Sequence, residues 1–217
     1  MLTATGIQKS YGPLKVLKSI DLRVEKGEIV AIVGASGAGK STLLHILGTL
    51  DNPDAGKVYI HSKDVFSQSS RNLAAFRNQS IGFVFQFHNL LPEFSALENI
   101  LIPGLIGGKE PKDLRKRAER LLDMLGISDR KDHKPSELSG GEQQRTAVAR
   151  ALINSPDLIL ADEPSGNLDS KNAVELHSLF FQLRKDLNQT FIIVTHNADL
   201  SKMADRRVEL RDGMIVR

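Results

Sequence analysis

A run of small residues that ends in lysine and serine suits the binding of phosphate groups. The segment Gly34-Ala-Ser-Gly-Ala-Gly39-Lys40-Ser41 matches the pattern Gly-x-x-x-x-Gly-Lys-Ser/Thr. Small side chains let backbone N–H groups at a helix N-terminus turn toward a phosphate. In this pattern the lysine, Lys40, would reach the β- and γ-phosphates, and the serine, Ser41, would bind Mg²⁺. A glycine-rich turn without function is disfavoured by the apolar strand before it and the helical spacing after it. We expect a nucleotide to contact Gly34, Ala35, Ser36, Gly37, Ala38, Gly39, Lys40, Ser41 and Thr42.

A second candidate lies where an apolar strand ends in two acids. Leu158–Ala161 runs directly into Asp162 and Glu163. One carboxylate at such a strand end can bind Mg²⁺, and the next can extend toward the attacking water. We therefore assign Asp162 to the metal and Glu163 to the role of general base. Taken alone, an acidic strand end before a proline is more often only a turn, and the upstream phosphate loop favours the chemical interpretation.

The segment Leu138–Arg145, LSGGEQQR, stands between these two groups in the sequence. At a helix start, the hydroxyl of Ser139 and the bare backbone of Gly140 and Gly141 can approach a phosphate without obstruction by side chains. Ser139 with Glu142 three residues later also fits an ordinary capping box. The two interpretations are compatible, and both stay open at this point.

The strands that would position these residues are short and apolar. Alternation around 3–9, 16–24 and 56–60 predicts an antiparallel β element at the front of the chain. The continuous apolar run 28–33 enters the phosphate loop, and 41–47 has helical spacing, so this segment is a parallel α/β signature. Three further apolar runs predict buried parallel strands at Ile81–Phe85, Leu158–Ala161 and Phe191–Thr195.

Helical periodicity dominates the middle of the chain. Residues 112–125 and 141–153 show it, and 92–154 has no strong strand signal. We predict an α/β P-loop NTPase (RecA-like) core with an N-terminal antiparallel β subdomain and an inserted α-helical subdomain. The core would comprise 1–87 and 155–217, and the helical subdomain would comprise 88–154 and carry the Ser139 loop.

Bulk properties narrow the class of protein. The chain has 217 residues, 41% of them apolar, which suits one domain with a substantial core. It has no Cys, and its six His lack metal-ligand spacing, so we expect no disulfides and no zinc site. No signal peptide and no apolar run of ~20 residues is visible, which favours a cytoplasmic location. The net charge of +3 is scattered, so we expect a solvated surface and no nucleic-acid partner.

Six motifs in the same order across nearly the whole chain resemble the ATP-binding cassette (ABC) ATPases. The resemblance implies an ABC-type fold, ATP hydrolysis and a homodimer that sandwiches ATP and Mg²⁺. In that family an aromatic before the first strand pair stacks on adenine, and here it falls on Tyr11, for which a core tyrosine is the alternative. The loop Ser139, Gly140 and Gly141 would act on the nucleotide of the other protomer.

Three further motifs take their roles from the same resemblance. Gln86 would sense Mg²⁺ and the attacking water, and it leads into the surface for membrane subunits; His196 would contact the γ-phosphate. A D-loop would cross the dimer interface at Asn167, Leu168 and Asp169. The catalytic set expected from all these motifs is Glu163, His196, Gln86 and Lys40, with Ser41, Gln86 and Asp162 at Mg²⁺.

Within the family, the stretch Gln86–Ile100 most resembles ATP-binding subunits of lipoprotein-releasing systems, which act from the cytoplasmic face of the bacterial inner membrane. Arg77–Gln79, Pro135–Ser139 and Gly166–Asn172 resemble the same subfamily, and the chain departs at Ser165, where Thr is usual. The implied function is to power release of lipoproteins toward the outer membrane. A cell-division-type ATPase that regulates cell-wall hydrolysis and a macrolide-type exporter remain alternatives. A soluble ABC ATPase of translation or DNA repair usually has tandem cassettes or a long coiled-coil insertion. The sequence shows neither feature, so this third class is not supported.

The segment after Gln86 is a candidate surface for a membrane partner. Apolar side chains there could grip a short helix of an integral membrane subunit. Packing into the helical subdomain is an equally open alternative. The residues concerned are Phe87, Leu90, Leu91, Pro92 and Phe94.

Overall fold

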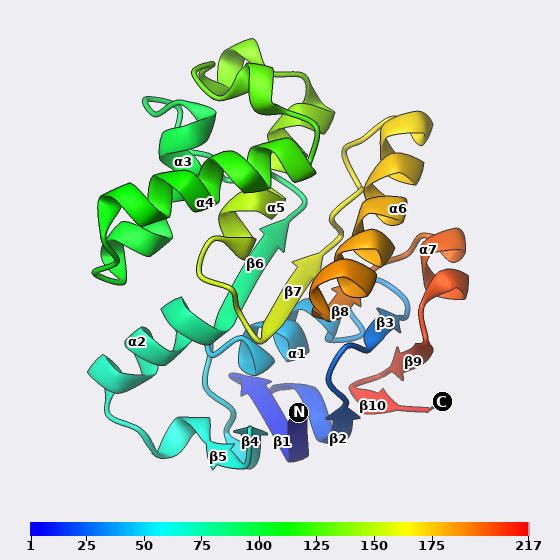
Figure 1. The fold of residues 1–217 in the computed structure, drawn as a ribbon. Coiled ribbons are helices and arrows are strands. Elements are labelled where there is room, and N and C mark those ends of the chain that lie inside the picture. Colours follow the sequence, from blue (N-terminus) through cyan, green and yellow to red (C-terminus); the bar gives the residue numbers. More distant parts are fainter. Residues whose placement is uncertain (217) are drawn as a thin grey trace. The chain divides into compact units, whose positions relative to one another are not determined.

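A computed structural model describes residues 1–216 as two compact units. The first unit comprises Met1–Arg77 together with the chain from Arg184 onward, and the second comprises Asn78–Leu183. Figure 1 shows both units with their helices and strands labelled. Among the described residues, none of the helices has the length and apolar character needed to cross a bilayer.

An antiparallel sheet forms the N-terminal part of the first unit, as predicted. Its strand order is β2-β1-β4-β5. Side chains alternate between buried and exposed along β1, and the buried Leu2, Ala4 and Ile7 form part of the core. This period of two is what a sheet with one solvated face requires. The strands are β1 (Leu2–Tyr11), β2 (Leu14–Val24), β4 (Ala55–Ile60) and β5 (Lys63–Asp64).

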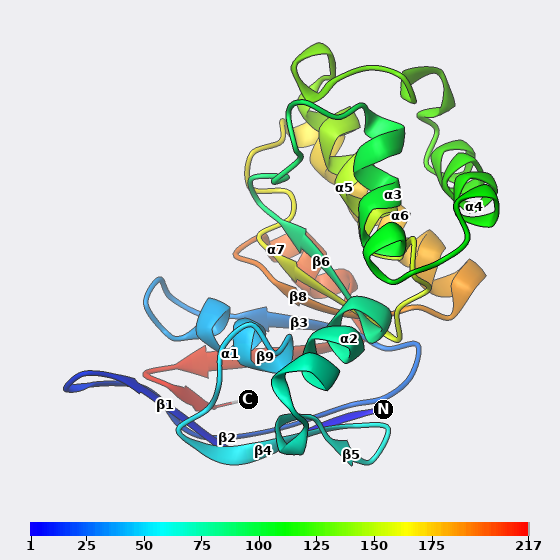
Figure 2. The same cartoon turned by 90° about the vertical axis from the view of Figure 1, so that its left-hand side faces the viewer.

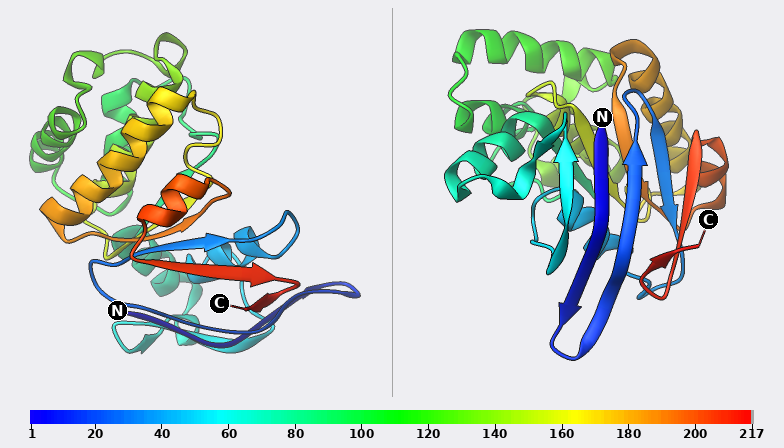
Figure 3. Two further views of the ribbon diagram at one scale, coloured as in Figure 1. Left: turned by 90° about the vertical axis from the view of Figure 1, so that its right-hand side faces the viewer. Right: turned by 90° about the horizontal axis from the view of Figure 1, so that it is seen from below.

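Parallel strands carry the phosphate loop in the same unit. The central strand β3 (Ile29–Val33) pairs in parallel with β8 (Thr190–Val194) on one side and β9 (Arg206–Arg211) on the other. Every residue of β3 and β8 is buried, as predicted from their continuous apolar runs. Figure 3 (left) shows β9 beside β3 with the same direction. The remaining elements are α1 (Lys40–Leu47), a 3₁₀ turn at Val65–Ser67, α7 (Ala198–Met203) and β10 (Met214–Ile215).

Strand β9 was not predicted, and its composition explains why. It reads Arg-Arg-Val-Glu-Leu-Arg, and only Val208 and Leu210 are buried. Four charged side chains in six positions hide a strand from a search for apolar runs, although the alternation itself has the period of a strand. Helix α2 (Ser70–Ser80) was missed for a related reason, because none of its residues is buried.

The second unit places helices around two parallel strands. β6 (Ile81–Phe85) and β7 (Leu158–Asp162) pair in register, with Phe85 opposite Asp162. Helix α5 lies so close to β6 that a Cβ on Gly82 would be only 2.5 Å from the carbonyl oxygen of Ala151. Figure 2 shows α3 and α5 side by side. The helices are α3 (Ala96–Ile106), α4 (Pro111–Met124), α5 (Gly140–Leu152) and α6 (Ser170–Leu187), with 3₁₀ turns at Ser128–Arg130 and Pro135–Glu137.

Helices α4 and α5 begin and end within one residue of their predicted bounds, whereas α3 was not predicted. Apart from Glu98 and Asn99 its sequence is apolar, so it lacks a clear helical periodicity, and it contains two poor helix formers, Pro103 and Gly104. Tertiary contacts supply what the sequence lacks. The side-chain amides of Asn78 and Asn154 donate to the carbonyl oxygen of Pro103 at 3.0 and 3.2 Å, and Gly104 leaves room for the side chain of Leu114.

Candidate active site

The loop between β3 and α1 depends on glycine at three positions. Gly34, Gly37 and Gly39 have φ angles of 149°, 77° and 100°, which residues with a Cβ rarely adopt. A Cβ at Gly34 would overlap the backbone carbonyl of Leu210, and one at Gly39 would lie 2.8 Å from a methyl group of Leu17. The spacing of the motif is therefore a conformational requirement of this chain.

The surface of the loop suits an anion. Ala35, Ser36, Gly37 and Ser41 are exposed, and no side chain among the described residues caps the start of α1 at Gly39. The Lys40 ammonium donates to the carbonyl oxygens of Gly34 at 2.9 Å and Ala35 at 3.0 Å. A cation above exposed backbone at a helix N-terminus fits a triphosphate, and the Ser41 hydroxyl is an oxygen ligand suited to Mg²⁺.

His196 lies beside this loop in the same unit. It is exposed at the second position after β8, and Asn197 caps α7 by accepting a hydrogen bond from the Leu200 amide at 2.9 Å. His196 and Gly34 both line a cavity of 310 Å³. The structure thus brings together two predicted site residues that are distant in sequence. The rest of the lining consists of Val33, Ala198, Ser201, Arg207 and Glu209.

Tyr11 lies at the end of β1, which corrects the expectation that it precedes the first strand pair. The alternative of a core tyrosine is also wrong, because the residue is 50% exposed. Its hydroxyl donates to Asp51 at 2.6 Å, and the Lys9 ammonium lies 5.2 Å from the ring centroid. The bond to Asp51 raises the pKa of Tyr11, and a bond with the Thr42 side chain opposes this. The ring is thus held near the start of α1.

In the second unit, the ends of two parallel strands bring three predicted residues together. Gln86 follows β6, and Asp162 ends β7 directly opposite Phe85. Glu163 comes next, is half-buried, and has a φ of 46°. Carboxylate and amide oxygens at the carboxyl ends of neighbouring strands form a donor set suited to Mg²⁺.

Gln86 is bonded to the D-loop, a pairing that sequence reasoning did not predict. Its Nε2 donates to Oδ1 of Asn167 at 2.9 Å, and Nδ2 of Asn167 donates to the Gln86 carbonyl oxygen at 3.2 Å. Gly166 permits this approach, since a Cβ there would be 3.0 Å from the Gln86 amide nitrogen. Because Nε2 is the atom engaged, Oε1 of Gln86 keeps its capacity to accept a bond or bind a cation.

The rest of the D-loop leads into α6. The carboxylate of Asp169 accepts from the backbone and side-chain amides of Asn172 at 2.8 and 2.7 Å, and the backbone bond lowers the pKa of Asp169. Leu168 lies 3.7 Å from the position of a Cβ on Gly140. The D-loop and the start of α5 are therefore neighbours within one chain.

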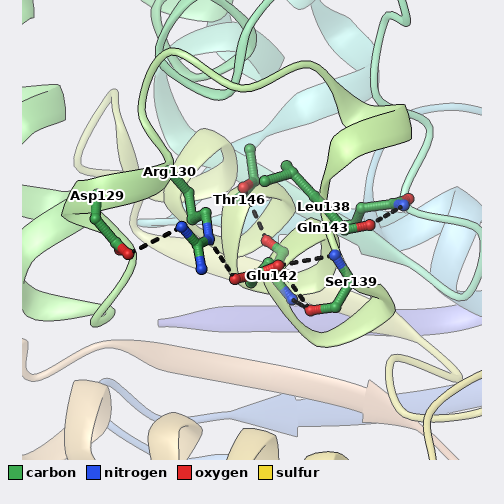
Figure 4. Close-up of polar contacts among 7 residues, drawn as sticks. All are labelled: Asp129, Arg130, Leu138, Ser139, Glu142, Gln143 and Thr146. Atoms are coloured by element: carbon green, nitrogen blue, oxygen red, sulfur yellow. Dashed lines mark hydrogen bonds and ion pairs between the residues drawn. The ribbon is translucent and has the colours of Figure 1, made fainter.

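The Ser139 loop forms the capping box that its sequence predicts. The Ser139 hydroxyl accepts from the Glu142 amide at 3.3 Å, and Glu142 accepts from the Ser139 amide at 2.8 Å and from its hydroxyl at 2.8 Å (Figure 4). Arg130 donates to the other oxygen of Glu142 at 2.7 Å, and this bond, followed by those of Ser139, lowers the pKa of Glu142 to about 2. Arg130 was missed, because nothing in its local sequence indicates the contact.

At the start of α5 the exposure of the loop differs by residue. Ser139 and Gly140 are exposed, so a ligand can reach them. Gly141 is buried, and a Cβ there would be 2.6 Å from the amide oxygen of Asn172. The two glycines are thus required for different reasons, close packing at Gly141 and open access at Gly140.

The segment after Gln86 turns apolar side chains outward. Phe87, Leu91 and Phe94 are 70%, 42% and 41% exposed, so core packing does not account for them. Two side chains hold the backbone beneath: Arg150 donates to the carbonyls of His88 and Asn89 at 2.7 and 2.6 Å, and buried Asn99 bonds the amide and carbonyl of Leu91 at 2.8 and 3.1 Å. Pro92 is also exposed, and Leu90 is half-buried.

Comparison with known proteins gives a consistent result. A family model described as ABC transporter matches residues 17–166. The lipoprotein-releasing system ATP-binding protein LolD of Cytophaga hutchinsonii is 59% identical over 216 residues, covering 100% of this chain and 99% of that protein. The protein of the same name from Bacteroides thetaiotaomicron is 60% identical over 215 residues, or 99% of each chain.

Solved structures of similar proteins show the same fold. A dimeric post-hydrolysis state of the ATP-binding cassette MJ0796 bound to ADP and Pi has a TM-score of 0.91 and 39% identity, covering 100% of this chain and 97% of that one. The cbiO1 protein of Clostridium perfringens, part of the ABC transporter complex cbiONQ, has a TM-score of 0.90 and 30% identity, covering 100% and 86%.

Proposed function

The chain belongs to the ABC transporter family, and on that premise we propose that it is the ATP-hydrolysing subunit of a bacterial lipoprotein-releasing complex. The observation that carries the proposal is identity of 59% and 60% to two LolD proteins along essentially the full length of each chain. These relatives favour lipoprotein release over the cell-division and macrolide-export alternatives. The ATPase chemistry itself follows from the family and does not depend on the cargo.

In the first unit, the phosphate loop binds the triphosphate of ATP. Lys40 exchanges its bonds to the Gly34 and Ala35 carbonyls for the β- and γ-phosphate oxygens. Backbone N–H groups from Gly34 to Thr42 supply further donors, Tyr11 stacks on adenine, and His196 contacts the γ-phosphate. Positioned charge of this kind supplies most of the catalysis in phosphoryl transfer.

Asp162 and Gln86 of the second unit would supply oxygen ligands for Mg²⁺, and the Ser41 hydroxyl of the phosphate loop would supply another. When bound, Mg²⁺ would neutralise charge that develops on the phosphate oxygens. Glu163 accepts the proton of the attacking water as its oxygen bonds to the γ-phosphorus and the bond to the β–γ bridging oxygen breaks. The products are ADP and phosphate.

The working unit is a homodimer. Ser139 and Gly140 are exposed at the start of α5, where they would contact the γ-phosphate of ATP held by the partner protomer. Gly141 keeps that turn closely packed, and Asn167, Leu168 and Asp169 would lie along the interface. The dimeric MJ0796 cassette, 39% identical, supports this arrangement.

The chain would dock as a peripheral protein on the cytoplasmic face of the inner membrane. The exposed apolar side chains of Phe87, Leu91 and Phe94 are the proposed contact for a short helix of an integral membrane subunit. In this scheme 88–154 acts as the helical subdomain of one ABC domain, with 1–87 and 155–217 as its catalytic core.

Copurification from native membranes tests the function. We expect the full chain to retain integral membrane proteins, and the complex to release a lipidated protein when ATP and Mg²⁺ are added. Lys40→Ala should still assemble but release nothing, since loss of one well-placed charge costs about 2.7–4 kcal/mol of barrier.

Phe87→Asp provides the matched control for docking. It should keep ATP hydrolysis but lose the membrane proteins, because the change is confined to an exposed side chain. A complex that retains a partner controlling cell-wall hydrolysis and releases no lipoprotein would support the cell-division alternative instead.

A further inference from the structure

A buried histidine is bonded to the turn that follows Glu163. Nε2 of His177, on α6, lies 2.9 Å from the hydroxyl of Ser165. His177 is 3% exposed, so its ring is fixed by packing within α6 and its surroundings. Ser165 lies two residues after Glu163, in a turn closed by a bond from the Gly166 amide to the Glu163 carbonyl at 3.0 Å.

This turn carries backbone strain at the residue that matters for the chemistry. Glu163 has a φ of 46°, a left-handed conformation that costs a residue with a Cβ on the order of 1–2 kcal/mol. Such a conformation persists only where the surroundings hold it. Two short backbone bonds hold the turn from within, the second from the Leu168 amide to the Ser165 carbonyl at 3.2 Å.

The bond to His177 ties the turn to a long helix. α6 comprises 18 residues, and its buried face includes Phe180, which is 0% exposed. A turn bonded to a side chain of such a helix is held more firmly than a turn held only by its own backbone bonds. The serine also suits the contact, because its hydroxyl rotates without the β-branched restriction of the threonine usual in this family.

We propose that His177 is a positioning residue which, through Ser165, holds the Glu163 carboxylate in the orientation needed for ATP hydrolysis. This inference rests on the proposed role of Glu163 as general base. His177 does not touch the reacting atoms. It acts on the rate of the chemical step and leaves binding of ATP by the other unit's phosphate loop unaffected.

Steady-state ATP hydrolysis of the full chain tests the proposal, with ATP affinity measured separately by titration of a fluorescent ATP analogue. His177→Phe and Ser165→Ala each remove the bond and should lower kcat roughly three- to tenfold, the range of one neutral hydrogen bond. ATP affinity should stay within about twofold, because the phosphate loop is unchanged. The double variant should be no slower than the slower single variant, since both remove one bond.

Conservative variants supply the rescue arm. His177→Gln retains a donor and an acceptor, and Ser165→Thr retains the hydroxyl, so both should recover part or all of kcat. Phe180→Leu loosens the same helix without touching the bond, and it should lower thermal stability with kcat retained.

Three results would overturn the proposal: unchanged kcat in Ser165→Ala, additive losses in the double variant, or an equal loss of kcat in Phe180→Leu. A Glu163→Gln variant distinguishes failure of the proposed role of Glu163 from failure of the positioning role of His177. If it hydrolyses ATP normally, the role of Glu163 fails whatever the His177 variants do. If it is inactive while the His177 variants match the native protein, only the positioning role fails.

Discussion

The carboxylate of Glu142 holds the first turn of α5 through both of its oxygens. One oxygen takes the Arg130 guanidinium and the other takes the amide and hydroxyl of Ser139. A negative charge beside a loop proposed to meet a phosphate would be repulsive by itself, and Arg130 offsets it. The same network uses the single O–H of Ser139, so contact with a phosphate would require that hydroxyl to rotate away from Glu142.

This network predicts an acid-sensitive contribution to stability. The usual pKa of Glu142 is 4.5, and in the folded chain it falls to about 2. Because the folded value is the lower one, the contribution is complete above pH 4.5 and is lost as the pH falls toward 2. Glu142→Gln should therefore flatten the fall in unfolding free energy between these limits, measured by urea denaturation at a series of pH values.

Glu98 offers a matched control for that measurement. It forms the same capping box with Ser95 at the start of α3, and its pKa is lowered chiefly by the Ser95 backbone bond, without an arginine bonded to its carboxylate among the described residues. Glu98→Gln should flatten the pH profile less than Glu142→Gln does. Equal effects would mean that Arg130 contributes little.

At the scale of elements, the phosphate loop owes its shape to contacts with the neighbouring strands. Comparing two of its glycines distinguishes the energetic cost of a strained backbone angle from the cost of a steric overlap. Both have positive φ, but a Cβ at Gly37 would meet nothing within 4 Å, whereas one at Gly34 would overlap the Leu210 backbone. Gly37→Ala should cost about 1–2 kcal/mol of stability from conformation alone. Gly34→Ala should cost about 3 kcal/mol or more, because backbone must also move.

Urea unfolding of the two alanine variants measures the difference. The fold should survive in Gly37→Ala, and ATP binding should weaken because the new methyl group projects from the exposed face of the loop. Similar costs for the two variants would show that the contact with Leu210 relaxes easily.

The same scale shows how far sequence reasoning reaches. The buried strand β3 is apolar throughout, and β8 is apolar after Thr190, so the sequence contains the signal that defines them. β9 was missed because four charged side chains hide its alternation from a search for apolar runs, and α3 because tertiary contacts, and not its own pattern, decide its structure. In the site, glycine and carboxylate motifs were found by local spacing. Contacts between positions far apart in the sequence could not be predicted, because no local pattern in a single sequence indicates which residues pair. These contacts join Arg130 to Glu142, Gln86 to Asn167, and Ser165 to His177.

At the scale of the whole molecule, one chain contains every predicted motif but is not expected to use all of them on one nucleotide. Within the second unit, Gly140 is exposed and lies against Leu168 of the D-loop. Both segments are proposed to meet a second copy. The structure therefore offers a position at which dimerisation can be blocked without disturbing the fold of the protomer.

Gly140→Asp in a Glu163→Gln background makes that prediction testable. The position has room for a Cβ, whose nearest neighbour would be 3.7 Å away, so the protomer should keep its melting temperature. The new carboxylate would face the partner's γ-phosphate, and like charges at a few ångströms repel strongly where water is excluded. Light scattering should find Glu163→Gln as a dimer only with ATP and Mg²⁺, and the double variant as a monomer throughout. Ser178→Asp adds the same charge on the exposed side of α6 and should leave the dimer intact. A double variant that still dimerises in ATP would contradict the sharing of nucleotide between two copies.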